Sequence, residues 1–140
     1  GYSDRCKMDK DRIEKPSLLS PLVLAYIGDG VYELFVRERL ILMHSDMPAY
    51  KLHKLAIKYV CAHAQSNSIL NIECELSESE DAIYKRGRNA KSPTVPKNAD
   101  VAEYRRATGF ETLIGYLYLK GDLQRLNELM NKAFETALNN

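Results

Sequence analysis

The segment from Leu24 to Val36 reads LAYIGDGVYELFV and constrains the fold more than any other stretch of the chain. Its apolar residues recur at helical spacing on more than one side, which predicts a helix buried in the centre of the molecule. Gly28, Asp29 and Gly30 interrupt it. Glycine inside a helix costs about 1 kcal/mol relative to alanine, and a carboxylate in apolar surroundings costs more unless it is compensated. The helix is therefore either broken here or carries a site.

A second segment, TGFETLIGYL from Thr108 to Leu117, places Glu111 in an apolar helix that also contains glycines. Glycines allow two helix backbones to approach closely, because no Cβ lies between them. If Gly28 or Gly30 meets Gly109 or Gly115, Asp29 and Glu111 face each other. Two such carboxylates cannot both stay ionised unless a cation joins them, and Mg²⁺ takes oxygen ligands of this kind. On the pattern alone, pairing of each acid with a nearby Arg or Lys stays open.

The rest of the chain carries helix start and stop signals and no alternation of period two. We expect an all-α fold of five to seven helices. Residues 1–16 alternate in charge without apolar periodicity, which predicts a flexible N-terminal arm before one domain over 17–140. The expected helices run from Ser20-Pro21 to about Met43, from Ser45–Pro48 to around Leu70, from the capping box Ser77–Glu80 to Gly87, from Asp100 to Gly121, and from Asp122 onward.

Charge is concentrated in one part of a nearly neutral chain. The net charge is +1, yet the segment from Lys85 to Arg106 contains seven basic and two acidic residues. This distribution indicates either a local contact with a polyanion or a solvated loop. The three cysteines form no CxxC pair, which favours a reducing cytoplasm. Apolar runs are too short for a membrane span.

The stretches LAYIGDGVYE and KRGRNAKSPTVPKNADVAEYRRATGFETLIGYLYL, in this order and spacing, resemble the Mini-ribonuclease III family. These are small bacterial relatives of ribonuclease III without a double-stranded-RNA-binding domain, and the similarity covers roughly residues 18–138. It implies a helical ribonuclease III-type catalytic domain over 17–140 and a cytoplasmic homodimer without membrane contact. It also implies Mg²⁺-dependent cleavage of double-stranded RNA, with Mn²⁺ as a substitute metal. The implied substrate is the 23S ribosomal RNA precursor, and a large-subunit ribosomal protein is a candidate partner.

The resemblance also assigns residues. Asp29 and Glu111 match the two catalytic, metal-binding acids of the family. The basic loop of the family falls on the stretch from Lys85 to Lys97, and the candidate RNA contacts are Lys85, Arg86, Arg88, Lys91, Lys97 and Arg105. A salt bridge to Glu103 or to another acid is the alternative for Arg105 and its neighbour Arg106. Larger ribonuclease III enzymes carry further carboxylates where this chain has Ala25 and Thr108, which leaves the number of metal ions open.

Two rival functions belong to other classes. A non-catalytic RNA-binding or ribosome-assembly module on the same fold would be favoured by loss of Asp29 or Glu111, and both are present. A helical protein–protein adaptor would account for the apolar helices but not for a basic loop beside two acids. The resemblance therefore implies an endoribonuclease that leaves 5′-phosphate ends.

Overall fold

The computed structural model describes residues 13–92 and 94–140, and every regular element within them is helical. This confirms the all-α prediction. Two 3-10 turns and six α-helices follow one another as η1 (Pro16–Leu18), α2 (Pro21–Met43), α3 (Ala49–Val60), α4 (Ala62–Ile72), η2 (Glu73–Glu75), α5 (Glu78–Arg88), α6 (Val101–Lys120) and α7 (Leu123–Leu138). The predicted arm over 1–16 falls almost wholly on residues 1–12, which lie outside the described residues, while Pro16 is buried.

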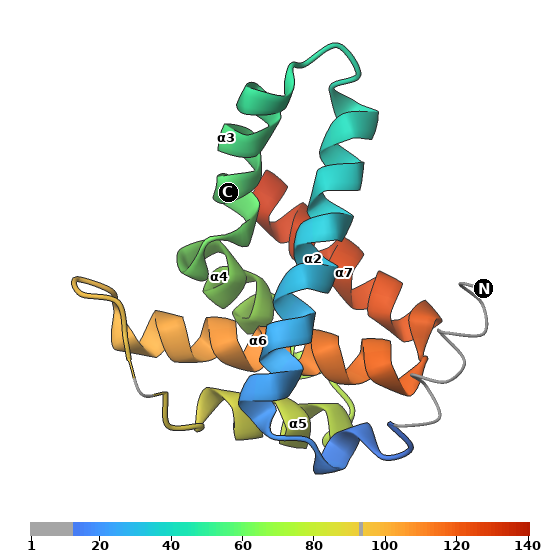
Figure 1. The fold of residues 1–140 in the computed structure, drawn as a ribbon, viewed down its shortest axis with the longest axis vertical. Helices are drawn as coiled ribbons and strands as arrows, with labels where there is room; N and C mark the ends of the chain where they lie inside the picture. The colour runs from blue at the N-terminus through green and yellow to red at the C-terminus, as the bar shows by residue number, and fades with distance from the viewer. Residues whose placement is uncertain (1–12, 93) are drawn as a thin grey trace.

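The centre of the molecule is the crossing of α2 and α6 (Figure 1). α2 stands along the long axis, and α6 runs across its lower half with α5 beneath it. α4 and α7 complete the core against these helices. Aromatic rings fill that core: Tyr32 meets Phe110 edge-on at 5.0 Å between ring centroids, and Tyr59 stacks on Phe134 at 4.5 Å. Such pairs add to the stabilisation from burial.

Several helix ends lie where the sequence predicts them. Pro21 occupies the first turn of α2, although the Ser20 side chain makes no capping bond. Ser77 and Glu80 form the predicted capping box at the start of α5. Gly121 ends α6 in the left-handed conformation at φ 83°, and the Asp122 side chain caps α7. These signals depend on local chemistry, which explains why they can be read from sequence.

The single helix expected up to Leu70 is wrong, because the chain breaks at Cys61. Cys61 is extended, at φ −67° and ψ 158°, and separates α3 from α4. The break turns α4 onto α6 and α7, where the Ser68 hydroxyl donates to the Ala133 carbonyl at 3.0 Å. α3 instead stays with the upper part of α2 and forms a projecting arm (Figure 1). No proline or glycine marks the break, so tertiary packing decides it.

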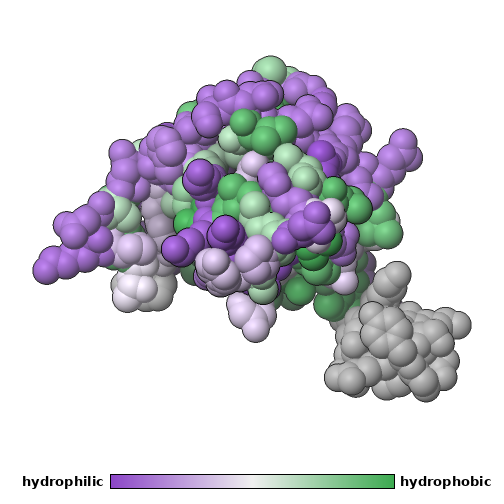
Figure 2. Space-filling view, turned by 90° about the horizontal axis from the view of Figure 1, so that it is seen from above, coloured by the Kyte–Doolittle hydropathy of each residue, from purple (hydrophilic) through white to green (hydrophobic). Residues whose placement is uncertain are grey.

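The expectation of a buried central helix holds for only one face of α2. Tyr32, Val36 and Leu40 are buried, but Tyr26 is 82% exposed and Leu34 is 59% exposed. Viewed from the α2–α3 end, hydrophilic residues cover most of the surface, and apolar residues gather in patches between them (Figure 2). One face of α2 therefore forms the core, while another presents apolar side chains to the outside.

Candidate active site

Two glycines bring α2 and α6 into backbone contact. A Cβ on Gly28 would run into the carbonyl of Glu111, and a Cβ on Gly115 would run into the carbonyl of Leu24. The contact is reciprocal, so neither helix can approach as closely with any larger residue. Of the pairings that the sequence allows, the structure uses Gly28 with Gly115. Gly30 has nothing within 4 Å of an added Cβ.

The close crossing brings Asp29 and Glu111 together, as predicted. Glu111 is half-buried, Asp29 is exposed, and the two side chains share a hydrogen bond. Burial raises the pKa of Glu111 to about 9, helped by the hydrogen bond and the charge of Asp29 and by the charge of Glu33. A hydrogen bond from Gln65 acts in the opposite direction. Glu111 therefore keeps a proton at neutral pH while no cation is bound.

The alternative of an ordinary salt bridge is not what the structure shows. Among the described residues, no Lys or Arg forms an ion pair with Asp29 or Glu111. A raised pKa without a cationic partner marks a place where negative charge awaits compensation. This arrangement is typical of functional sites rather than of structural ion pairs.

The oxygen donors at this position fit a hard divalent cation. Asp29 and Glu111 supply carboxylates, and the Gln65 amide lies next to them. Elsewhere in the described chain, as here, no three His, Cys, Asp or Glu side chains gather into a complete metal cluster. A cation at this pair would take its remaining ligands from water and from a substrate phosphate, which is the usual habit of Mg²⁺.

Two residues near the acids escaped the sequence interpretation. Glu33 lies one helical turn after Asp29, so its i+4 spacing could have placed it on the same face of the helix. Gln65 lies on α4, and nothing in the sequence signals that α4 packs on α6. Thr108, which stands where larger relatives carry a carboxylate, donates its hydroxyl to the Tyr104 carbonyl at 3.0 Å. Ala25 is buried and offers no donor.

The six predicted RNA-binding residues do not form one uniform loop. Lys85, Arg86 and Arg88 lie on α5, and only Lys91 and Lys97 belong to the segment between α5 and α6. Lys91, Lys97 and Arg105 are exposed. The last of these lies in the second turn of α6, on the helix that carries Glu111.

The three basic residues of α5 have partners within the chain. Lys85 pairs with Asp81 at 2.7 Å. Arg86 donates to the carbonyls of Ser17 and Leu19 at 2.8 and 3.1 Å, and so ties α5 to the turn before α2. The Arg88 guanidinium lies over the Tyr84 ring, 5.6 Å from its centroid. Arg86 in particular has a structural task that the sequence did not indicate.

The neighbouring residues on α6 also differ from the sequence interpretation. Glu103 contacts His63 at 2.7 Å rather than an arginine. Arg106 donates to the Ser66 hydroxyl at 2.8 Å and so ties α6 to α4. The salt bridge considered for Arg105 and Arg106 is therefore not made with Glu103.

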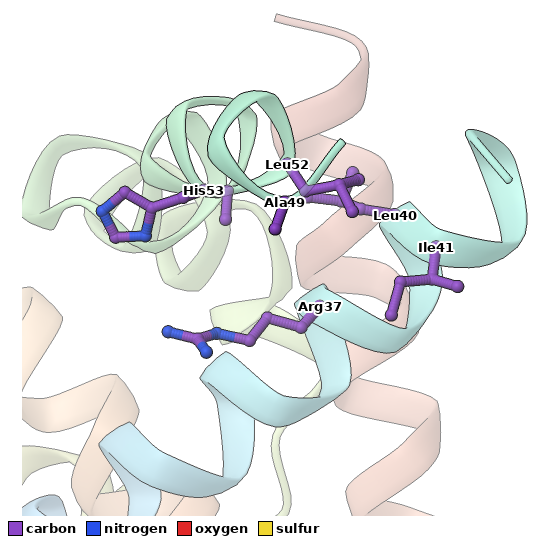
Figure 3. A pocket seen from close by; sticks show the side chains of 7 residues that line it. Arg37, Leu40, Ile41, Ala49, Leu52 and His53 are labelled. Atoms are coloured by element: carbon purple, nitrogen blue, oxygen red, sulfur yellow. The ribbon is translucent and has the colours of Figure 1, made fainter. Parts of the chain in front are cut away.

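A second basic surface lies on α3. Lys51, Lys54 and Lys58 are exposed there, and α3 contains no acidic residue. A hollow of about 170 Å³ opens between α3 and α2, lined mainly by apolar side chains. Arg37 and His53 point to the same side of it (Figure 3). This hollow is not at the acid pair. The lysines were overlooked because only the segment from Lys85 to Arg106 has a strong local excess of charge.

Comparison with known proteins settles the class. The Ribonuclease III domain family matches residues 22–122, which include both helices of the crossing and the acid pair. The helical fold and this match define a ribonuclease III-type endoribonuclease. In the described chain, no helix combines the length and apolar character needed to cross a bilayer.

Named relatives refine the assignment. The Mini-ribonuclease 3 of Clostridium tetani is 54% identical over 80% of this chain and 74% of its own length. That of Brevibacillus brevis is 48% identical over 91% of this chain and 95% of its own length. A crystal structure of a Fusobacterium nucleatum protein superposes with a TM-score of 0.73 at 32% identity, covering 81% of this chain and 90% of that one. The chain belongs to the Mini-ribonuclease III family.

Proposed function

We propose that this endoribonuclease is Mg²⁺-dependent, cleaves double-stranded RNA, and uses Asp29 and Glu111 as its catalytic, metal-binding residues. The observation that carries the proposal is the shared hydrogen bond of the two carboxylates without a Lys or Arg partner in the described chain. Such a pair is stable at neutral pH only if one acid is protonated or a cation is bound. Mn²⁺ is the expected substitute for Mg²⁺, since it accepts the same oxygen ligands.

Asp29 and Glu111 have different roles in the proposed reaction. Asp29, exposed on α2, offers its carboxylate to the cation from the solvent side. Glu111, once it loses the proton that its raised pKa retains, would hold the same cation as a second ligand. When bound, Mg²⁺ lowers the pKa of a ligand water and neutralises charge on the scissile phosphate. In-line hydrolysis at such a site would leave 5′-phosphate and 3′-hydroxyl ends, as the resemblance implies.

The RNA-binding surface that we propose has two parts. Lys91, Lys97 and Arg105 are exposed between α5 and the start of α6, with Lys85, Arg86 and Arg88 beside them on α5. The exposed lysines of α3 lie near the other end of α2 (Figure 1). A-form RNA presents phosphates and 2′-hydroxyl groups that proteins recognise mainly by shape and charge. We propose that one duplex contacts both parts.

We also propose that the protein works as a homodimer. Tyr26 and Leu34 are exposed on α2 on either side of Asp29, which makes an apolar surface that one copy leaves open. Phe35, on the same helix, packs against the core and does not contribute to this surface. A two-fold dimer would present two acid pairs to the two strands of one duplex.

The natural substrate that we propose is the 23S ribosomal RNA precursor, processed in the cytoplasm, and the candidate partner is a large-subunit ribosomal protein. The resemblance of the sequence motifs implies this substrate and this partner. Membership of the Mini-ribonuclease III family supports both proposals. The structure supports the chemistry of the site rather than the identity of the RNA.

One experiment tests the reaction. Structured double-stranded RNA is incubated with the purified protein in Mg²⁺ or in EDTA, and the product ends are mapped. We expect cleavage with 5′-phosphate ends in Mg²⁺ and none in EDTA. Binding without cleavage in Mg²⁺ would instead support the non-catalytic RNA-binding module.

A further inference from the structure

The hollow between α2 and α3 combines an apolar lining with two nitrogen-bearing side chains. Apolar residues, among them Leu40, Leu52 and Ala56, form most of the lining, and none of the lining residues is acidic. Arg37 and His53 are exposed and point to the same side of the hollow (Figure 3). Within the described chain neither of them forms an ion pair. Both side chains are therefore available to a ligand.

The surface of α3 around the hollow is basic. Lys51, Lys54 and Lys58 are exposed on α3, and this helix contains no acidic residue. A surface with one sign of charge raises the local concentration of groups of the opposite sign. Charge complementarity therefore favours an anionic occupant, and the apolar lining favours one that also has an apolar part.

The size of the hollow limits that apolar part to a single ring system. Its volume is about 170 Å³, whereas pockets for drug-sized ligands measure roughly 300–1,000 Å³. A nucleotide joins one apolar ring face to a polar ring edge and a phosphate. The guanidinium of Arg37 suits the phosphate, which arginine binds with two parallel hydrogen bonds. The ring of His53 suits the base, on which it can stack.

Base pairing decides which nucleotide of an RNA can enter the hollow. Bases inside a duplex are stacked on one another, and proteins reach the ring faces of RNA mainly where bases are unpaired. The position of the hollow fits the same RNA that the acid pair would cleave. Arg37 follows Asp29 by eight residues on α2, which is about 12 Å at the helical rise of 1.5 Å per residue.

We propose that the hollow between α2 and α3 binds one unpaired nucleotide of the RNA substrate, with Arg37 on its phosphate and His53 on its base. The hollow is then a specificity site, and it favours duplexes that carry an unpaired nucleotide near the cut. This inference rests on the proposed cleavage of double-stranded RNA and adds a preference among such substrates.

Two RNA duplexes of the same sequence test the site, one fully paired and one with a single unpaired adenine a few base pairs from the cut. Binding is measured in Ca²⁺ and cleavage in Mg²⁺. We expect the wild-type protein to bind the interrupted duplex about fivefold or more tightly, the low end of what stacking on one base contributes. His53→Ala removes the ring and Ala49→Leu fills part of the hollow, so each should abolish the preference. His53→Phe keeps a ring and should retain part of it.

Lys54→Ala is the matched control. Lys54 is exposed on the same helix, next to His53 in the chain, but it does not line the hollow. Its loss should weaken the binding of both duplexes alike and leave the preference unchanged. Melting temperatures show whether each variant is folded, and the mass in solution shows its oligomeric state.

Equal wild-type affinity for the two duplexes would overturn the site, as would a preference that survives both His53→Ala and Ala49→Leu. Equal weakening of both duplexes by His53→Ala would make His53 a general phosphate contact instead. An altered oligomeric mass of Ala49→Leu, with the preference intact, would assign the hollow to a second copy of the chain. Failure of the wild-type protein to cleave either duplex in Mg²⁺ would refute the proposed function, whereas cleavage of both without a binding preference would refute only the nucleotide site.

Discussion

Glu80 is a buried acid and Glu111 is a half-buried one, and folding shifts their pKa values in opposite directions. Glu80 is 7% exposed, and Arg125 donates to both of its carboxylate oxygens at 2.8 Å. This pairing and the backbone N–H of Ser77 hold the pKa of Glu80 below its ordinary range. Glu111 faces another carboxylate instead, and its pKa is raised to about 9.

The difference separates an acid whose charge is compensated within the fold from the acid that we propose as catalytic. The charge of Glu80 is compensated within the chain. The residue therefore contributes to stability and requires no bound ion. Glu111 has no Lys or Arg partner within the described chain and keeps its proton at neutral pH, so in the proposed function it is a bound cation that would compensate its ionised form. Strain of this kind is common at sites where stability has been given up for activity. Five changes test this contrast.

The largest effect should come from Asp29→Asn. The substitution keeps the size of the side chain but removes the charge that binds the cation, so cleavage should fall by at least about 100-fold. RNA binding should persist, because the basic residues are untouched. Turnover is measured on a structured duplex in Mg²⁺, with binding measured in parallel. Near-normal turnover would refute the assignment of the site.

Glu80→Ala should destabilise the fold without affecting the active site. It leaves Arg125 without its main partner and removes half of the capping box, which should cost roughly 3 kcal/mol of unfolding free energy. Because the pKa of Glu80 is lowered on folding, its contribution is present above the ordinary value of 4.5 and is lost as the pH falls below it. Chemical denaturation at pH 7 and at pH 3 measures the loss of unfolding free energy that the substitution causes at each pH. An equal loss at the two pH values would contradict the ion pair.

Gly28→Ala tests the close helix crossing. The new Cβ would meet the Glu111 carbonyl, so we expect a loss of about 1–3 kcal/mol of stability from overpacking and reduced cleavage. Gly30→Ala is the matched control, since its Cβ would meet open space and should stabilise the helix by up to about 1 kcal/mol. Equal unfolding free energies for the two variants would mean that the crossing is looser than described.

Glu111→Gln should stabilise the metal-free protein while abolishing cleavage. In the unfolded chain Glu111 ionises near 4.5, but in the folded chain it does so only near 9. Folding therefore takes up a proton between these values, and stability falls as the pH rises through this window. The variant does not undergo this fall, so its advantage in unfolding free energy should grow from almost nothing at pH 4 to roughly 3–5 kcal/mol at pH 8, since each pH unit in the window is worth about 1.4 kcal/mol. Melting temperatures across this range, measured in EDTA, would show a constant difference if the raised pKa were absent.

The smallest effect concerns the exposed basic segment. Replacing Lys91 and Lys97 with alanine should weaken binding to all duplexes alike and make the slope of log affinity against log salt shallower by about two, if both contact phosphate. Arg86→Ala should change stability more than this slope, because Arg86 is bonded to the turn before α2. Binding is measured in Ca²⁺ across a salt series. An unchanged slope for the lysine variant would place the RNA elsewhere.

The fold was predictable from the sequence at positions where a residue type has a single structural role that depends only on its neighbours in the chain. Pro21, the Ser77–Glu80 box and Gly121 mark helix ends by their own chemistry, and paired glycines beside acids predicted the crossing. The break at Cys61 was not predictable, because its extended conformation depends on what α4 packs against.

The same limit applies to the site. The partnership of Gln65 with Glu111 and that of Arg86 with the Ser17 carbonyl join residues far apart in the chain. The exposure of Tyr26 likewise depends on which face of α2 the other helices cover. Apolar periodicity indicates that a helix has an apolar face, but it does not identify the surface that meets it.

The crossing of α2 and α6 also determines the stage of protein synthesis at which the candidate active site can form. Asp29 and Glu111 are about eighty positions apart, and contacts of such long range form late relative to local helices. A chain still emerging from the ribosome, with α2 and α3 complete but α6 not yet made, has its first acid and several lysines but no carboxylate pair. In the proposed mechanism such a fragment lacks the second metal ligand, so cleavage would have to wait until nearly the whole domain has been translated.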